Sequence, residues 1–340
     1  MLTIVICNYN HAQFLRDAID SALEQSALQD VTVMVVDDGS TDRSCEIIAG
    51  YGSRIEAVFQ RNGGQVAAYN HALERVVTPY VLFLDADDRL HSDAAATVLA
   101  AFAAGDCVKV QYRLDVITED GTPTGVQVPQ TIAAPDCGAL LRGGWLYPSP
   151  PGSGNAYRAD ALRQVFPVPV NADNIHGADF YAIYGIALVG EVSAIERSLG
   201  SYRVHRHTRK GAPAQGNTSL SLANAEDALA GARQAARRWA ILRGIARERL
   251  GIALPPVILD FSVEKAEFAT VVYGAPLARR WHWFLHESGR YFHTIVANPF
   301  WSARKKVAVW CLTALCLVPV ASLSNRVVRY IANPLARAGY

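Results

Sequence analysis

Three carboxylates follow directly on an apolar segment of strand length. Residues 81–84 read Val-Leu-Phe-Leu, and Asp85-Ala86-Asp87-Asp88 come next. An apolar run of this length is typical of a buried strand. Its carboxylates should therefore leave the core at the carboxyl edge of a sheet, where open α/β sheets bind ligands. Carboxylate oxygens suit hard cations such as Mg²⁺ or Mn²⁺, which in turn bridge phosphates. Taken alone, the segment fits a strand followed by an acidic turn and a capped helix equally well.

A second apolar run, residues 33–36, also ends in acidic residues, Asp37 and Asp38. Two strands that end in acidic loops predict one site at one edge of a sheet. Gly39 permits a tight turn there and a close approach of the backbone to a ligand. Asp37 and Asp38 repel each other unless ligands or hydrogen-bond donors stabilise them, whereas Asp42 is expected to cap the helix that follows.

The chain has 340 residues, of which 51% are hydrophobic, and is long enough for one large domain or two modest ones. Its net charge of only +1 gives no strong positive electrostatic field that would attract nucleic acid, so we expect no nucleic-acid partner. The six cysteines show no C-x-x-C pairing, which favours free thiols in a reducing compartment. Residues 1–7 lack a charged segment and a cleavage site, so we expect a first strand there rather than a signal peptide.

Strands and helices are expected to alternate over the first hundred residues. The apolar spacing predicts strands over 2–7, 31–36, 55–59 and 80–84, and helices over 14–23, 42–50, 65–77 and 92–104. This alternation predicts a mainly parallel sheet covered by helices on both faces. Residues 143–155 are rich in Gly, Pro and Ser, and form either a loop that shapes a binding site or a plain connector.

The first hundred residues resemble the A-type nucleotide-sugar glycosyltransferases of family 2. The segments that carry the resemblance, in matching order and spacing, are residues 4–10, 35–42, 62–70 and 83–88. The resemblance continues more loosely to about Arg209. It implies an α/β fold of the GT-A type, in which a mainly parallel nucleotide-binding sheet is flanked by helices. Here a mostly α-helical C-terminal extension follows.

Three sections are expected along the chain. The resemblance implies that residues 1–105 bind the donor and that residues 106–215 form the acceptor-binding and catalytic half of the same domain. Residues 216–340 form the helical region, in which residues 219–250 are rich in Ala and Arg and predict an ordinary solvated helix. The segment 234–239, Gln-Ala-Ala-Arg-Arg-Trp, is one residue too long for the Q-x-x-R-W motif of processive polysaccharide synthases.

The resemblance also implies roles for the acidic segments in holding a nucleotide diphosphate sugar. Asp87 matches the final aspartate of the family's motif and is the expected ligand of a divalent metal, Mn²⁺ or Mg²⁺. Asp85, separated from it by Ala86, is expected to contact the ribose or to reach the metal through water. Asp88 is interpreted as a carboxylate at the start of a helix. The residues expected near the base and ribose are Asn8, Tyr9, Asp37 and Asp38, with Arg61 and Asn70 as further candidates for the same region.

The general base is expected on a later element. The family usually carries a Glu-Asp pair at the start of a helix, and here Ala178 replaces the glutamate while Asp179 is retained. Asp179 is the expected base, since a partly buried carboxylate with a raised pKa suits the task. The alternatives are that Asp179 is a helix cap and that His176 is the base. A single displacement without a second nucleophile implies inversion at the anomeric carbon.

Two further segments resemble parts of the family pattern. Asn155 is expected either to touch the acceptor or only to fix a turn. His205 is expected either to ligate the metal or a phosphate, or to be an exposed histidine in a basic loop. That loop, residues 206–210, is suited to close over a bound nucleotide because clustered cations attract phosphate.

The C-terminal region contains an almost wholly apolar run, residues 307–321, with basic residues on both sides. A spanning helix needs about 20 apolar residues, and Pro319 interrupts the run. Aromatic residues and basic flanks favour a peripheral contact with a membrane through about residues 300–330. The alternative is a buried core helix.

These features together predict an inverting, metal-dependent glycosyltransferase of cell-surface polysaccharide biosynthesis. The donor is expected to be a UDP-sugar, the acceptor a glycan or a lipid-linked glycan, and the location the cytoplasm or the inner face of the cytoplasmic membrane. A nucleotidylyltransferase would need a Gly- and Lys-rich phosphate loop, which residues 6–10 do not provide. A non-catalytic nucleotide-sugar-binding or scaffold protein is the other alternative, against which the intact Asp85, Asp87 and Asp179 argue.

Overall fold

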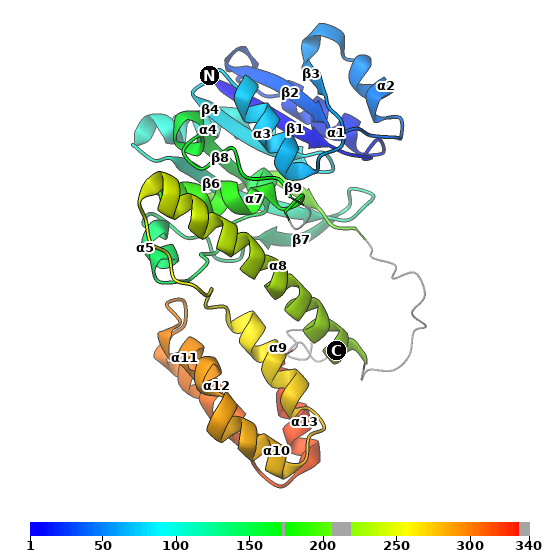
Figure 1. Ribbon diagram of the computed structural model, residues 1–340. Coiled ribbons are helices and arrows are strands. Elements are labelled where there is room, and N and C mark those ends of the chain that lie inside the picture. The colour runs from blue at the N-terminus through cyan, green and yellow to red at the C-terminus, as the bar shows by residue number, and fades with distance from the viewer. Residues whose placement is uncertain (172–173, 206–218, 333–340) are drawn as a thin grey trace. The chain divides into compact units, whose positions relative to one another are not determined.

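The computed structural model describes residues 1–171, 174–205 and 219–332. The chain divides into two compact units (Figure 1). The first unit comprises residues 1–208 and 237–256, and the second comprises residues 209–236 and 257–340. The basic loop expected to close over a nucleotide, residues 206–210, lies outside the described residues.

A mixed sheet of nine strands forms the centre of the first unit. The strands are β1 (Leu2–Asn8), β2 (Val31–Asp37), β3 (Glu56–Phe59), β4 (Tyr80–Asp85), β5 (Arg89–Leu90), β6 (Lys109–Ile117), β7 (Pro123–Val128), β8 (Asn155–Arg158) and β9 (Val192–Arg203). Their order is β3-β2-β1-β4-β8-β6-β9-β5, and β7 pairs with β6 outside this path. The pairs from β3 to β4 are parallel, as predicted for the first hundred residues, and β8 is antiparallel to both of its neighbours.

The helices of the first unit follow from the apolar spacing of the sequence. They are α1 (Leu15–Leu23), α2 (Ser44–Ala49), α3 (Gln65–Arg75), α4 (Ala94–Ala104), α5 (Cys137–Arg142), α6 (Ala159–Leu162), α7 (Ala178–Phe180) and, from Arg237 on, α8 (Ser219–Leu250). Alternate strand residues such as Ile4 and Val35 share a buried cluster with α1, α2 and α4. On α3, the Tyr69 ring stacks on Phe83 of β4 at 3.8 Å between centroids, and this aromatic contact adds to area burial.

The register of the parallel strands brings the expected site residues to one edge of the sheet. Asn8 of β1 pairs with Asp37 of β2, and Cys7 of β1 pairs with Asp85 of β4. The side chains that end these strands must therefore lie next to one another, as the two acidic loops predicted. All six cysteines are free, which confirms the expectation from their spacing.

The second unit is helical where it is described. Its helices from residue 257 on are α9 (Phe261–Val272), α10 (Leu277–His282), α11 (Gly289–Ala297), α12 (Ala303–Leu315) and α13 (Ala321–Ala332), with a π-helical turn at Trp283–Glu287. Phe268, Tyr291, Ile295 and Val328 form the centre of its core. The apolar run 307–321 is not one helix, because α12 ends at Leu315 and a turn follows. Among the described residues, no helix combines the length and apolar character needed to cross a membrane.

Candidate active site

A cleft of about 620 Å³ lies at the carboxyl edge of β1, β2 and β4. Its lining includes most of the residues that the sequence assigned to donor binding: Asn8, Tyr9, Asp38, Asp85, Ala86, Asp87 and His205. His176, the rival base, lies in the lining as well. Asp37 and Asn70 are not lining residues, and the Asn70 amide instead makes two hydrogen bonds of 2.9 Å to the backbone of Val168.

Asp37 is a buried carboxylate that fixes the first acidic loop. It accepts hydrogen bonds from Asn8 Nδ2 at 2.8 Å and from the Ser40 amide at 2.9 Å. These donors stabilise the charge that the neighbouring carboxylate would otherwise repel. The same bond orients Asn8, whose buried Oδ1 has no hydrogen-bond partner among the described residues. Asn8, which lines the cleft, therefore carries one buried acceptor without a partner among the described residues.

Asp38 is held by donors from a different segment. Its Oδ1 accepts from Gln60 Nε2 at 2.6 Å and the Gly63 amide at 2.9 Å, and its Oδ2 accepts from the Gly64 amide at 2.8 Å. Gly64 has a φ of 84°, and a Cβ there would lie 2.4 Å from the Ile175 carbonyl oxygen. Only glycine therefore allows this close approach between the two segments.

Asp87 and His205 converge on one point of the cleft. His205 Nε2 lies 2.7 Å from Asp87 Oδ2. Asp85, half-buried behind them, has a pKa well above its usual range, because of burial and because of the carboxylates of Asp88, Asp179 and Asp87. A divalent cation would relieve this accumulation of negative charge. No group of three or more His, Cys, Asp or Glu side chains suited to hold a metal occurs in the described part of the chain.

Asp88 does not start a helix, contrary to the expectation from the sequence. The short strand β5 follows it, and α4 begins only at Ala94. Asp88 is 1% exposed and accepts from Ser153 Oγ at 2.6 Å and from the Arg203 amide at 2.8 Å. Burial raises the pKa of Asp88 to about 7. The residue thus ties together three segments that are far apart in the sequence.

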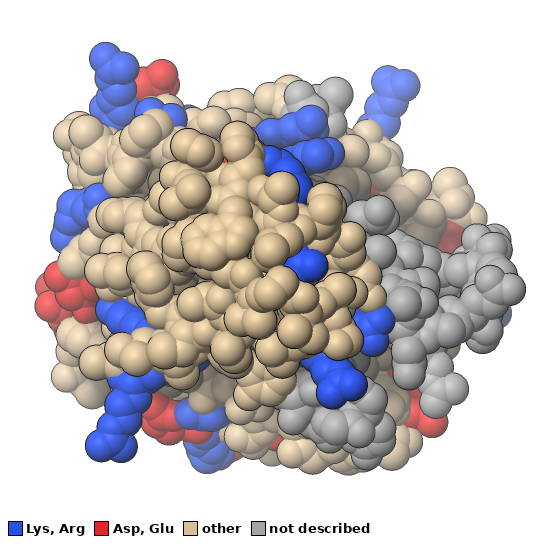
Figure 2. Space-filling view, turned by 90° about the horizontal axis from the view of Figure 1, so that it is seen from below, with Lys and Arg blue, Asp and Glu red and all other residues tan. Residues whose placement is uncertain are grey.

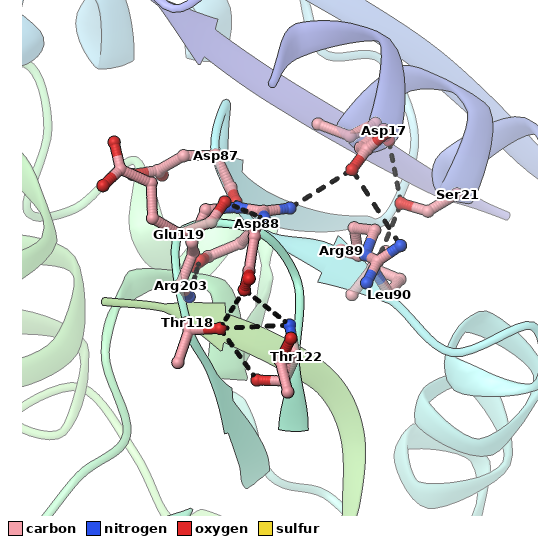
Figure 3. A network of polar contacts seen from close by, with 12 residues as sticks. Asp17, Ser21, Asp87, Asp88, Arg89, Leu90, Thr118, Glu119, Thr122 and Arg203 are labelled. Carbon is pink, nitrogen blue, oxygen red and sulfur yellow. Dashed lines mark hydrogen bonds and ion pairs between the residues drawn. The ribbon is translucent and has the colours of Figure 1, made fainter. Parts of the chain in front are cut away.

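Arg203, which sequence reasoning did not single out, fixes the backbone of the acidic turn (Figure 3). Its guanidinium is buried and donates to the carbonyl oxygens of Asp87 at 2.7 Å and Glu119 at 2.9 Å, and to Asp17 Oδ2 at 3.2 Å. It also lies over the Phe14 ring, 4.7 Å from the centroid, a favourable cation–π geometry. Arg203 therefore sets the position of Asp87 through the main chain.

The Gly-, Pro- and Ser-rich loop does not line the cleft, but it contacts the acidic residues beside it and is therefore not a plain connector. Ser153 Oγ accepts from the Asp85 amide at 3.0 Å while it donates to Asp88. A Cβ on Gly152 would lie 3.3 Å from Asp85 Oδ2 and 3.6 Å from Asp179 Cβ. Asn155 is buried and donates to the carbonyl oxygen of Pro151 at 2.7 Å. Of its two expected roles, the structure supports the fixing of a turn.

Asp179 lies beside Asp85, on the short helix α7. The helix start is held by Gln65 Oε1, which accepts from the amides of Gly177 at 2.8 Å and Ala178 at 3.1 Å. Asp179 is half-exposed by surface area and faces Gly152. Burial raises its pKa, and the nearby Arg238 lowers it in part. The structure thus shows a carboxylate in a setting that favours proton uptake at higher pH than usual.

Helix α8 is not an ordinary solvated helix at this point, which corrects the interpretation of residues 219–250. Trp239 is 1% exposed and donates from Nε1 to the Pro255 carbonyl oxygen at 2.8 Å. The preceding residue, Arg238, packs closely on Gly177. A Cβ on Gly177 would lie 2.1 Å from Cζ of Arg238. The high density of Ala and Arg suggested solvation, but one side of the helix from Arg237 on is buried against the first unit.

Comparison with known proteins finds relatives of one family over about half of the chain. Residues 3–166 match the model of Glycosyl transferase family 2. The chain is 33% identical over 214 residues to an uncharacterized glycosyltransferase of Nostoc sp., covering 60% of this chain and 65% of that protein. It is 40% identical over 106 residues to the teichoic acid poly(glycerol phosphate) polymerase of Staphylococcus epidermidis, covering 30% of this chain and 15% of that protein. The match therefore spans less than two thirds of the length of these relatives.

A solved structure has a similar fold. The structure of S. aureus TarS 1-349 in complex with UDP-GlcNAc matches with a TM-score of 0.51 and 14% identity, and covers 99% of this chain and 92% of that chain. At this identity the similarity concerns the fold. Together with the family match and the curated relatives, it supports a family 2 glycosyltransferase domain over residues 3–166, with the A-type fold.

Proposed function

We propose that the protein is an inverting, metal-dependent glycosyltransferase that moves a sugar from a UDP-sugar to a glycan or a lipid-linked acceptor. The observation that supports this most is the convergence of Asn8, Asp38, Asp85 and Asp87 on one cleft, with Asp179 beside Asp85. Among similar proteins, the polymerase of Staphylococcus epidermidis acts in teichoic acid synthesis, and TarS binds UDP-GlcNAc. Cell-surface polysaccharide biosynthesis is the process proposed for this chain.

The donor would occupy the cleft with its base toward the first acidic loop. Asp38 in the cleft lining is suited to accept from the N–H and hydroxyl groups of a nucleoside, and the side chain of Asn8 lies in the same lining. Tyr9, 46% exposed in the lining, offers an aromatic face for the base. Asp37 and Asn70 would act indirectly, since their side chains bind the surrounding backbone and Asn8. Residues 1–105 form the donor half in this proposal, and residues 106–215 the acceptor half.

Asp87 and His205 fit a divalent cation, Mn²⁺ or Mg²⁺. Their convergence within 2.7 Å supplies an oxygen and a nitrogen ligand, and Asp85 would bind through water. Such ions are commonly held by one or two protein ligands together with substrate phosphates, which agrees with the lack of a larger ligand cluster in the described residues. When bound, the ion supplies Lewis-acid stabilisation of the leaving diphosphate.

Asp179 would act as the general base. It would take the proton of the acceptor hydroxyl as that oxygen attacks the anomeric carbon, and the bond to the diphosphate would break on the opposite face. Burial keeps its pKa high enough for it to bind this proton. Gly152 lies against both carboxylates, since a Cβ there would come within 3.3 Å of Asp85 Oδ2 and 3.6 Å of Asp179 Cβ.

Arg238 is expected to tune this base. Because its positive charge lowers the pKa of Asp179, Arg238→Gln should raise that pKa further. A base works when deprotonated, so the acid limb of the profile of kcat/KM against pH should move to higher pH. Arg238→Lys, which keeps the charge, should leave the limb closer to that of the wild type. Arg247→Gln, an exposed position on the same helix, should leave it unchanged. If the acid limb of the kcat/KM profile stayed at the wild-type pH in Arg238→Gln, Arg238 would not influence the pKa of the base.

The acceptor determines the proposed location of the enzyme. A lipid-linked glycan would place the enzyme at the inner face of the cytoplasmic membrane, with a peripheral contact through about residues 300–330. A free glycan would leave it in the cytoplasm.

Calorimetric titration with UDP, with and without Mn²⁺, tests the proposed donor site. We expect binding that requires Mn²⁺. If UDP does not bind, the same titration with GDP and dTDP distinguishes a different base from a wrong site. Absence of metal-dependent binding for all three nucleotides would contradict the proposed function.

A further inference from the structure

Helix α12 exposes apolar side chains where the helices of globular domains normally expose polar ones. Six of the nine residues 307–315 are exposed, and all six are apolar: Val307, Ala308, Trp310, Cys311, Ala314 and Leu315. The single hydroxyl of this stretch, Thr313, is 1% exposed and donates to the Val309 carbonyl oxygen at 2.8 Å. Its Oγ also lies 2.9 Å from Tyr291 OH. The polar group therefore faces the core and the apolar side faces outward.

The turn after α12 continues this apolar surface. Residues 316–320 carry no polar side chain apart from the Cys316 thiol, and Val318 and Val320 are 36% and 46% exposed. The buried Arg280 fixes the turn from inside, because it donates to the carbonyl oxygens of Cys316 at 3.2 Å and Val318 at 3.5 Å. The turn is thus held in place while its valines remain exposed.

Aromatic contacts join α12 to α11 and to the segment before it. The Trp310 ring lies 4.2 Å from that of Phe292, and Phe284 lies between Phe292 and Trp281 at centroid distances of 5.4 and 6.1 Å. Trp281 and the neighbouring Leu285 are 43% and 65% exposed. We call this surface the apolar face, defined by Trp281, Leu285, Val307, Trp310, Leu315 and Val318.

The segment that carries α11, α12 and α13 has only basic charges, whereas the acidic Glu287 is exposed two residues after Leu285. Residues 288–340 contain seven Lys and Arg and no Asp or Glu, whereas residues 1–287 contain 25 Lys and Arg and 31 Asp and Glu. The net charges are therefore +7 and −6. Arg304, Lys305 and Arg326 are exposed on α12 and α13. Figure 2, the view from below, shows a mostly uncharged central area, with Lys and Arg and also some Asp and Glu toward its edges.

We propose that the apolar face docks on an anionic lipid bilayer, with α12 in the plane of the interface and residues 316–320 among the headgroups. An interfacial helix buries its apolar side at the boundary of the acyl chains, and nearby Lys and Arg bind anionic lipids. A second copy of the chain fits this surface less well, because it would bring two basic surfaces together. The inference rests on the membrane contact of the proposed function and specifies its surface and its lipid chemistry.

Sedimentation of the full chain with lipid vesicles tests this inference. The wild type should bind vesicles of phosphatidylcholine and phosphatidylglycerol at least about tenfold more tightly than vesicles of phosphatidylcholine alone. Val307→Asp with Val318→Asp should lose this binding by about tenfold or more, because two exposed valines of the apolar face become anionic. The matched control is Val77→Asp with Val126→Asp, which makes the same change at exposed valines of the first unit. It should bind like the wild type.

A second variant leaves the apolar face intact. Arg304→Gln with Lys305→Gln removes two exposed cations and should weaken binding to the anionic vesicles by about 30-fold, at about 1 kcal/mol for each residue. The inference would be overturned if the wild type bound both kinds of vesicle equally well. It would also be overturned if Val307→Asp with Val318→Asp bound vesicles as tightly as Val77→Asp with Val126→Asp. A dimer that Val307→Asp with Val318→Asp dissociates, without lipid binding, would assign the face to self-association instead. The vesicle assay contains no donor, so its failure is distinguishable from a failure of nucleotide binding.

Discussion

Asp179→Asn is expected to lower the rate of sugar transfer by about 10²- to 10⁴-fold, the usual contribution of a general base. The substitution preserves the size of the side chain but removes the ability to accept a proton. Donor affinity should stay close to that of the wild type, because Asp179 is not among the residues that line the donor cleft. Steady-state rates of nucleotide release with the acceptor, together with calorimetry of the donor, separate the two effects.

His176→Gln is the matched control for this experiment. His176 lies in the cleft lining and is the rival candidate for the base. If Asp179 is the base, His176→Gln should retain most of the transfer activity. Normal turnover by Asp179→Asn with the true acceptor, or a larger loss in His176→Gln, would refute the assignment.

Asp87→Ala is expected to abolish the metal-dependent part of UDP binding. Loss of a residue that only supports a metal ligand commonly costs 10- to 100-fold in metal affinity. Loss of a ligand itself should therefore weaken UDP binding in Mn²⁺ by at least about 100-fold. The substitution should also free His205 Nε2, which lies 2.7 Å from Asp87 Oδ2. Calorimetry with and without Mn²⁺ measures the effect.

Asp106→Ala provides the control, because this carboxylate has a side chain that is 94% exposed and lies outside the cleft lining. It should bind UDP as the wild type does under both conditions. In the absence of Mn²⁺, all three proteins should bind UDP equally weakly. Wild-type affinity of Asp87→Ala in Mn²⁺ would show that the metal, if it binds, is held elsewhere.

The sheet edge and its acidic residues could be predicted from the sequence because they follow local rules. Apolar runs of strand length that end in Asp37 and Asp85 specify both the strands and the end at which their side chains meet. The register, with Asn8 beside Asp37 and Cys7 beside Asp85, follows from the parallel pairing of neighbouring strands. The expected helices also began and ended within about two residues of the observed ones.

The supporting residues could not be predicted in the same way, because their roles depend on contacts between distant segments. Asp88 looks like a helix start locally, yet its partners are Ser153 and Arg203. Arg238 looks solvated in an Ala- and Arg-rich helix, and only the fold brings it onto Gly177. Periodicity likewise could not show that α12 directs its one hydroxyl inward and its apolar side chains outward.

The hydrogen bonds of Asp88 have a consequence for the order in which the protein can mature. Ser153 lies 65 residues, and Arg203 115 residues, after Asp88. A nascent chain that has left the ribosome as far as residue 150 contains residues 1–105, the proposed donor half, but neither partner. Since domains tend to fold from the N-terminus as they are synthesised, the parallel strands can assemble before the acidic turn has its supports. The acidic turn of Asp87 and Asp88 is therefore fixed only after β9 has joined the sheet, so we expect a partly synthesised chain to lack the proposed metal and donor site.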